Sequence, residues 1–229
     1  MNDKQVKIDL KEEIIISSFS KEDLDSFIQI HVEHLFSDSR FSRIYLAERF
    51  KYLLKLEDAV TVCAKDIHGK MLGLVYGGPE GYKNQMNKYI MNRIVWKLLR
   101  RPYLLFSGEF LYKYKSAIKR LIAKFKYKKN NVDHTSKSVK DVNIPLEPIL
   151  RLTGIAVLEK YSHLGIGEQL LMGFEKVAKE RSYKSIILET PNTNIRAIKF
   201  YEKFGWQNYV NEDANLGKVY FYKLIHENN

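Results

Sequence analysis

Two glycines set two residues apart, Gly165 and Gly167, lie in the stretch YSHLGIGEQLL between a strand-like run and a helix-like run. The first turn of a helix offers unpaired backbone N–H groups and the positive end of the helix dipole, which together suit a phosphate. Glycine lets the backbone approach such a group because it carries no Cβ. The same pair also suits a plain chain reversal, and the spacing fits neither a GxGxxG motif nor a P-loop. Two interpretations therefore stay open, an anion cradle or a tight turn.

The elements around this loop predict a mixed α/β domain, because the expected order is strand, two helices, two strands, an insertion, then strand, helix, strand, helix and strand. Ser20 with Asp23 is typical of a helix N-cap, and Gly69 suits the turn of a hairpin. We expect one domain over residues 1–229, with a basic helical insertion at 81–149. Strands are expected at 12–19, 59–66, 71–78, 150–157, 185–190 and 218–225, and helices at 23–36, 42–56, 165–181 and 194–204.

A second motif, LETPNTNIRAIKFYEKFGW at residues 188–206, follows the glycine loop. With the strand that ends in GIAV, the loop and this motif resemble the GCN5-related N-acetyltransferase (GNAT) family. The resemblance is specific over residues 150–206, extends over 12–80, and does not cover the basic insertion. It implies a GNAT-like mixed central sheet flanked by helices, and direct transfer of an acetyl group from acetyl-CoA to a primary amine without a metal.

The resemblance also implies which residues hold the cofactor. The family's loop pattern is Arg or Gln, two residues, Gly, one residue, then Gly or Ala, and Ser162 here replaces the long polar side chain. Backbone N–H groups can still hold the pyrophosphate. The implied cofactor-binding residues are Ile155, Ala156 and Val157 on the strand, Ser162, His163, Leu164, Gly165, Ile166 and Gly167 in the loop, and Asn194, Ala197 and Tyr201 beyond it. Asn194 also suits a helix N-cap, and His163 an exposed loop position.

Two residues carry the chemistry that the resemblance implies. Tyr201 matches the family's tyrosine beside the sulfur, where a phenol can protonate the departing thiolate. Glu189 lies 12 residues earlier, a relation that resembles the Glu and Tyr pair of protein-acetylating members, and its carboxylate could accept the amine's proton. The alternatives are a core aromatic at Tyr201 and a solvated strand-end carboxylate at Glu189.

The basic insertion concentrates the charge of the chain. Residues 81–140 hold 16 Lys or Arg against two acidic residues, a net charge of +14, so the remainder of the chain carries −3 of the total +11. Two basic amphipathic helices are expected, the first with an apolar face of Met91, Ile94, Val95, Leu98 and Leu99, the second over about 111–125. A polar connector follows at 126–143. The insertion could be a solvated face, a lid over an acidic acceptor such as a nucleotide sugar, or a surface for anionic lipid headgroups through residues 88–128.

The composition and the motifs also bear on cysteine chemistry, on location in the cell and on partners. Cys63 is the only cysteine, which excludes disulfides and CxxC chemistry within one chain. We expect a cytoplasmic protein, with peripheral membrane contact as an option, because neither a signal peptide nor a membrane span is evident. Nucleic acid is not favoured as a partner. The acceptor is expected to be a small or acidic amine such as an amino sugar. A protein or peptide amine, a non-catalytic acyl-CoA-binding adaptor, and a homodimer remain open.

Overall fold

The computed structural model describes residues 14–34, 38, 40–100, 146–209 and 217–225. The strands are β1 (Ile15–Ser17), β2 (Val60–Lys65), β3 (Met71–Pro79), β4 (Ile149–Val157), β5 (Ser185–Pro191), β6 (Gln207–Tyr209) and β7 (Lys218–Leu224). The helices are α1 (Leu24–His34), α2 (Arg40–Leu53), α3 (Tyr82–Arg100), α5 (Ile166–Glu180) and α6 (Ile195–Lys203), with 3-10 turns at Lys21–Asp23 and Glu159–Tyr161.

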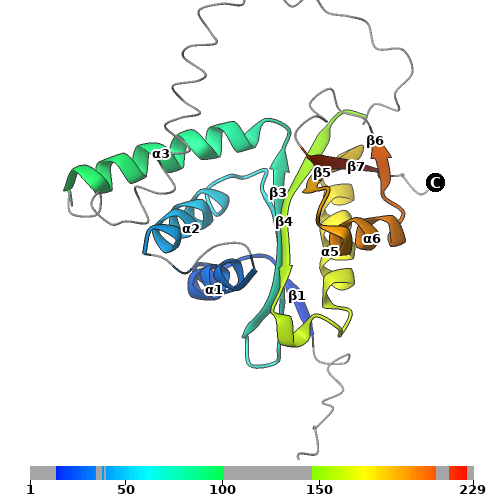
Figure 1. The fold of residues 1–229 in the computed structure, drawn as a ribbon, viewed down its shortest axis with the longest axis horizontal. Coiled ribbons are helices and arrows are strands. Elements are labelled where there is room, and N and C mark those ends of the chain that lie inside the picture. Colours follow the sequence, from blue (N-terminus) through cyan, green and yellow to red (C-terminus); the bar gives the residue numbers. More distant parts are fainter. Residues whose placement is uncertain (1–13, 35–37, 39, 101–145, 210–216, 226–229) are drawn as a thin grey trace, which may run out of the picture.

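All these strands join one sheet in the order β1-β2-β3-β4-β5-β7-β6 (Figure 1). Every neighbouring pair is antiparallel except β4 and β5, which run parallel. A parallel pair needs a crossover connection, and α5 provides it between these two strands. The predicted mixed α/β fold is thereby confirmed.

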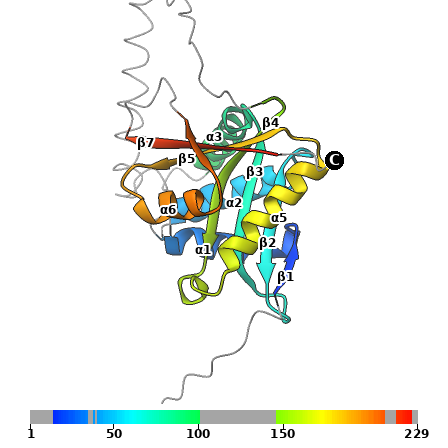
Figure 2. The same cartoon turned by 90° about the vertical axis from the view of Figure 1, so that its right-hand side faces the viewer.

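Helices cover both faces of the sheet. Helices α1, α2 and α3 lie on one face, and α5 and α6 on the other (Figures 1 and 2). Each layer has its own buried apolar cluster: Phe174 and Leu188 belong to the cluster under α5, and Phe27 and Leu74 to the cluster under α1. The sheet therefore separates two helical layers, each with its own apolar cluster.

Local sequence signals account for most of the element boundaries. The Asp23 carboxylate accepts a hydrogen bond from the Ser20 N–H at 2.7 Å, which caps the first helical turn as predicted. Gly69 closes the β2–β3 hairpin with a φ of 78°. Helix α5 buries the residues that recur at helical spacing, namely Ile166, Leu170, Leu171, Phe174 and Ala178.

Two features differ from the prediction. Strand β6 was not predicted, since a three-residue edge strand carries too little periodicity to be recognised. The predicted apolar face of the first insertion helix was wrong at Met91, which is 39% exposed. Helix α3 begins at Tyr82 and buries residues at four-residue intervals against α2 and β3, namely Tyr82, Met86, Ile90 and Ile94. The second insertion helix and the connector at 126–143 lie outside the described residues.

Candidate functional site

The glycine loop joins the end of β4 to the start of α5. Gly165 is the N-cap residue of α5 and has a φ of 75°. This backbone conformation is strained for residues that carry a Cβ, so the loop needs glycine at this position. Gly165 therefore has a conformational role whether or not the loop binds a ligand.

The loop leaves backbone N–H groups unpaired at the first turn of α5. The N–H groups of Ser162 and Leu164 are used within the turn, at 3.0 and 3.3 Å from carbonyl oxygens three residues earlier. The first bond into the helix runs from the Gln169 N–H to the Gly165 carbonyl, so the N–H groups of residues 165–168 have no acceptor in the described part of the chain. Together with the positive end of the helix dipole, these groups suit an anion.

Gly167 differs from Gly165, because its φ is not positive and its Cα faces neighbouring side chains. A Cβ added at Gly167 would lie 3.6 Å from ring carbons of Phe200 and 4.0 Å from a methyl group of Val157, which are ordinary contacts. A methyl group therefore fits at this position, and the requirement for glycine there must come from something other than packing. The neighbouring His163 side chain is exposed.

Strands β4 and β5 pair only at one end. Their parallel register joins Ile149–Arg151 to Ser185–Ile187 and then stops. Beyond these residues β4 follows β3 and β5 follows β7, so the two strands diverge (Figure 1). The diverging strands are called here the β4–β5 fork. In the described part of the chain no strand pairs with the fork-facing edge of β4, which includes the predicted cofactor segment Ile155–Val157, and alternate N–H and C=O groups on that edge are open to a ligand.

A β-bulge lies at the base of the fork. The register of β3 and β4 shifts at Tyr76, which pairs with Gly154, and leaves Thr153 as an extra residue. The hydroxyl of Tyr82, at the start of α3, hydrogen-bonds to Thr153 Oγ1. The bulge is therefore tied to the first residue of α3.

A buried polar network supports the bulge from the α1–α2 side. Arg49 Nη1 donates to the Tyr76 hydroxyl at 2.9 Å, and His31 Nε2 lies 3.1 Å from the same oxygen. Burial raises the pKa of Tyr76, and Arg49 opposes that rise only in part, so the phenol stays protonated. A Cβ at Gly154 would come within 2.9 Å of the Tyr76 ring, which shows how closely the bulge rests on it.

Glu189 lies two residues beyond the last β4–β5 pairing, at the mouth of the fork. Its Oε1 atom is 3.1 Å from Lys83 Nζ and 3.2 Å from Lys218 Nζ. Burial alone would raise the pKa of Glu189, but the two lysines outweigh this effect and hold the pKa below its usual range. The carboxylate is therefore ionised near neutral pH.

The two lysines reach Glu189 from elements that are remote in the sequence. Lys218 begins β7 and lies diagonally across from Glu189, which pairs directly with Tyr220. Lys83 lies in the first turn of α3, 106 residues before Glu189. Burial lowers the pKa of Lys83, and the ion pair with Glu189 offsets that decrease only in part. Neither lysine was among the residues predicted from the sequence.

Glu189 and Tyr201 lie on opposite faces of the sheet. Leu188 is buried in the cluster that contains Tyr201 and Phe221. Side chains alternate along a strand, so Glu189 points to the other face, where α3 supplies Lys83. A group held in the fork would therefore have a carboxylate on one side and a phenol on the other.

Tyr201 packs in the buried cluster of the α5 and α6 layer. It is 5% exposed, and its ring centroid lies 5.5 Å from that of Trp206 and 5.7 Å from that of Phe221. Burial raises the pKa of Tyr201, so its hydroxyl remains protonated and can act as a donor. On the same helix, Asn194 Oδ1 accepts a hydrogen bond from the Ala197 N–H at 3.2 Å, which is the N-cap contact that the sequence left as an alternative.

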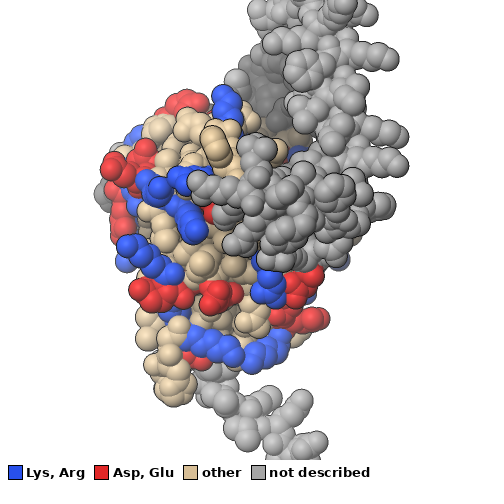
Figure 3. All heavy atoms as spheres, turned by 90° about the vertical axis from the view of Figure 1, so that its left-hand side faces the viewer, with Lys and Arg blue, Asp and Glu red and all other residues tan. Residues whose placement is uncertain are grey.

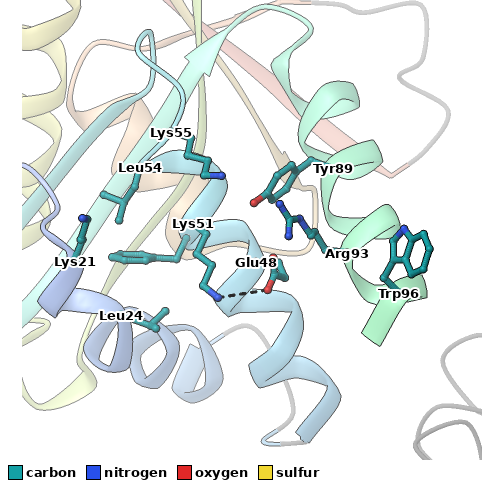
Figure 4. A pocket seen from close by; sticks show the side chains of 10 residues that line it. Lys21, Leu24, Glu48, Lys51, Leu54, Lys55, Tyr89, Arg93 and Trp96 are labelled. Atoms are coloured by element: carbon teal, nitrogen blue, oxygen red, sulfur yellow. Dashed lines mark ion pairs between the residues drawn. The ribbon is translucent and has the colours of Figure 1, made fainter. Parts of the chain in front are cut away.

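A cavity of about 590 Å³ lies apart from the fork, between α1, α2 and α3 (Figure 4). Phe50 forms part of its apolar lining, and Trp96 on its rim is 64% exposed. Among the described residues that line it, Glu48 is the one acidic residue, and its Oε1 atom lies 3.6 Å from Lys51 Nζ. The cationic side chains around it are Lys21, Lys51, Lys55 and Arg93.

The described residues contain no group of three or more His, Cys, Asp or Glu side chains that could hold a metal ion. Among the helices described, none is both long enough and apolar enough to cross a membrane.

Comparisons with known proteins agree with this fold. Residues 131–206 match the model of the acetyltransferase (GNAT) family. No curated protein sequence matches the chain. Solved structures of low identity share its fold. An acetyltransferase of the GNAT family from Staphylococcus aureus Mu50 has a TM-score of 0.53 at 14% identity, covering 93% of this chain and 99% of that one.

Two further structures have more specific descriptions. The ribosomal-protein-S18-alanine N-acetyltransferase from Escherichia coli has a TM-score of 0.50 at 16% identity, covering 94% of this chain and 96% of that one. The PaiA N-acetyltransferase from Thermoplasma acidophilum, solved with coenzyme A, has a TM-score of 0.50 at 13% identity, covering 92% of this chain and 98% of that one.

Proposed function

Because residues 131–206 match the model of the GNAT acetyltransferase family, we propose that the chain is a GNAT enzyme that transfers an acetyl group from acetyl-CoA directly to a primary amine. The observation that carries the proposal is the β4–β5 fork, with an anion-binding helix start on one face of the sheet and an ionised carboxylate on the other. GNAT enzymes use acetyl-CoA as co-substrate, and the fork residues fit that molecule.

The donor half of the site uses the backbone. The N–H groups of residues 165–168 would hold the pyrophosphate, and the open edge of β4 at Ile155–Val157 would pair with the pantetheine arm. The first turn of α5 lies on the same side of the sheet as α6, which carries Tyr201. Tyr201 would therefore lie near the sulfur and give the departing thiolate a proton.

The acceptor half lies on the α3 face. Glu189 would bind the acceptor's ammonium group and take its proton, so that the free amine can attack the thioester carbonyl. Holding both reactants in one opening makes direct transfer possible without a covalent acetyl-enzyme. Because Glu189 and Tyr201 lie on opposite faces of the sheet, Glu189 would accept the amine's proton on one side of the reacting carbon and Tyr201 would protonate the thiolate on the other.

The charges around Glu189 support an acceptor that carries an acidic group. Three cations, Lys83, Lys218 and Arg151, adjoin two carboxylates, Glu189 and Glu80, and Arg151 pairs with Glu80 at 2.7 Å. Among the described residues of this cluster, cations outnumber carboxylates by one. An amino sugar or nucleotide sugar that bears a phosphate or carboxylate would balance this excess. A protein or peptide amine is the alternative, supported by the 12-residue spacing of Glu189 and Tyr201.

The test combines two measurements. Calorimetric titration with coenzyme A examines the donor half, and thiol release from acetyl-CoA over panels of amino sugars, nucleotide sugars, polyamines and peptides examines the acceptor. We expect coenzyme A to bind and acid-bearing amines to give the highest rates. Absence of coenzyme A binding would refute the proposal, and binding without thiol release for any amine would reduce the chain to an acyl-CoA-binding protein.

A second function, docking on an anionic membrane surface as an adaptor, is supported by the cavity between α2 and α3. Its rim holds Trp96 and Arg93, and α3 carries five basic and no acidic residues. The face that these helices form mixes basic and acidic side chains (Figure 3), so the attraction would rest on this rim rather than on a wide basic patch. Sedimentation with vesicles of anionic phospholipid that is lost in a Trp96→Ala, Arg93→Ala variant would support docking, and no sedimentation of the parent would exclude it.

A further inference from the structure

Lys83 occupies the place that the proposed mechanism gives to the acceptor. Glu189 is the carboxylate expected to bind an ammonium group, and the ammonium group it binds in this structure belongs to Lys83, 3.1 Å away. A primary amine of the protein itself is therefore already positioned against the proposed base. This inference rests on the proposed acetyl transfer and extends it to a residue of the chain.

The position of Lys83 is fixed by its neighbour. Tyr82 is 2% exposed, and its hydroxyl bonds to Thr153 in the bulge at the base of the fork. A Cβ at Gly78 would come within 2.8 Å of the Tyr82 ring, so this ring packs directly on the backbone of β3. The first turn of α3 is thus held beside the bulge, and the Lys83 side chain, 29% exposed, lies at the mouth of the fork.

Lys218 contacts the same carboxylate but approaches it from the other side. In the sheet order, β7 lies beyond β5, away from β4 and the fork. Lys83 instead comes from a helix anchored to β4 itself. Of the two amines at Glu189, Lys83 is therefore the one on the side where a thioester in the fork would lie.

The local charges favour loss of a proton from Lys83. Burial lowers its pKa, and Arg151 and Lys218 add to the decrease, whereas Glu189 opposes it. A neutral amine is the nucleophile in acyl transfer, so these neighbours increase the fraction of Lys83 that can react. The proton that leaves has an acceptor at Glu189.

We propose that Lys83 is a self-acetylation site, modified by the acetyl-CoA that the chain itself binds when no other acceptor occupies the fork. The Lys83 Nζ atom attacks the thioester carbonyl, an N–C bond forms, and the C–S bond breaks. The ammonium form first gives one proton through Glu189 to solvent. Loss of a second proton from nitrogen balances the proton that the thiolate gains, so coenzyme A leaves as the free thiol.

Acetylation would change the site that performs it. The amide of acetylated Lys83 has no charge, so Glu189 would keep only Lys218 as a cationic partner. The change removes one of the cations that lower the pKa of Glu189 and gives the modified protein a different acceptor site.

The experiment is incubation of the full chain with acetyl-CoA and no acceptor, followed by peptide mass spectrometry over time. Lys88 is the internal reference for uncatalysed acetylation, because it is exposed on the same helix. We expect acetylation of Lys83 at least about tenfold faster than that of Lys88, as positioning of a reactive amine requires. The excess should disappear when coenzyme A is added as a competitor, and in Glu189→Gln.

Each outcome decides the matter. Equal acetylation of Lys83 and Lys88, or an unchanged excess in the presence of coenzyme A, would overturn self-acetylation. Faster acetylation of Lys218 than of Lys83 would refute Lys83 as the self-acetylation site. Failure of the proposed function is separate, because coenzyme A titration and thiol release with added amines are measured on the same preparation.

Discussion

Gly167 gives the sharpest test of the anion cradle, because a side chain there disturbs the protein least. The Cβ of a Gly167→Ala variant would make ordinary contacts at 3.6 to 4.0 Å with Phe200 and Val157. Alanine in place of glycine within a helix also favours folding by roughly 0.5–1 kcal/mol. We therefore expect the free energy of unfolding to stay unchanged or to rise slightly.

The affinity of the Gly167→Ala variant for coenzyme A should instead decrease. A pyrophosphate held by the first N–H groups of α5 would meet the new methyl group and lose contact with one donor or more. A hydrogen bond to a charged group contributes about 1.5–3 kcal/mol, so coenzyme A affinity should fall roughly 10- to 150-fold. The assays are calorimetric titration with coenzyme A and urea denaturation of the same preparations.

Two glycines provide matched controls for this variant. Gly69 and Gly165 have similar φ values, 78° and 75°, and a Cβ at either would meet nothing within 4 Å. Alanine at each should cost about 1–2 kcal/mol of stability through the left-handed backbone alone. Only Gly165→Ala should also weaken coenzyme A, because Gly69 lies in the β2–β3 turn. Unchanged affinity in both Gly165→Ala and Gly167→Ala would reduce the loop to a chain reversal and refute the cradle.

Three further predictions concern the fork and its support. Tyr201→Phe removes one hydroxyl from a packed ring, so turnover should fall by roughly 10² with coenzyme A affinity retained, and unchanged turnover in steady-state assays would leave Tyr201 as a core aromatic. Lys218→Met removes a cation that lowers the pKa of Glu189, so the acidic limb of the pH profile of kcat/KM should move to higher pH. Glu189→Gln removes the proposed base and should lose activity most at low pH. A limb that stays in place would show that Glu189 is not the base. Arg49→Met deletes the donor to Tyr76 and should cost about 1–3 kcal/mol in urea denaturation, whereas a stability equal to the parent would show that the network does not support the bulge.

The sequence predicted the parts of the fold that depend on local periodicity. The α5 face, the Ser20 cap and the Gly69 hairpin follow from spacing within a few residues, and the structure has all of them. On α3 the pattern placed Ile94 correctly but wrongly put Met91 on the apolar face, because the start of that face is set by Tyr82 packing on β3.

The candidate site was predictable only in part, for a similar reason. The glycine loop belongs to the first motif, and Glu189 and Tyr201 belong to the second, and both motifs lie within the stretch 150–206 that carries the resemblance. Lys83 lies 106 residues from Glu189, and the contact exists because α3 starts beside the bulge. No spacing rule in the sequence connects this lysine to Glu189.

The ion pairs at Glu189 restrict which amine can be an acceptor. An incoming ammonium group that takes the place of Lys83 at Glu189 Oε1 would leave this lysine as a partly buried cation without the counterion it has among the described residues. An acceptor that brings only an amine leaves this cost uncompensated. An acceptor that carries an acidic group close to its amine exchanges partners instead: its amine takes the place of Lys83 at Glu189, and its anion pairs with the displaced lysine. The same contact that makes Lys83 an internal acceptor therefore favours external acceptors in which an amine and an acid lie within a few bonds of each other.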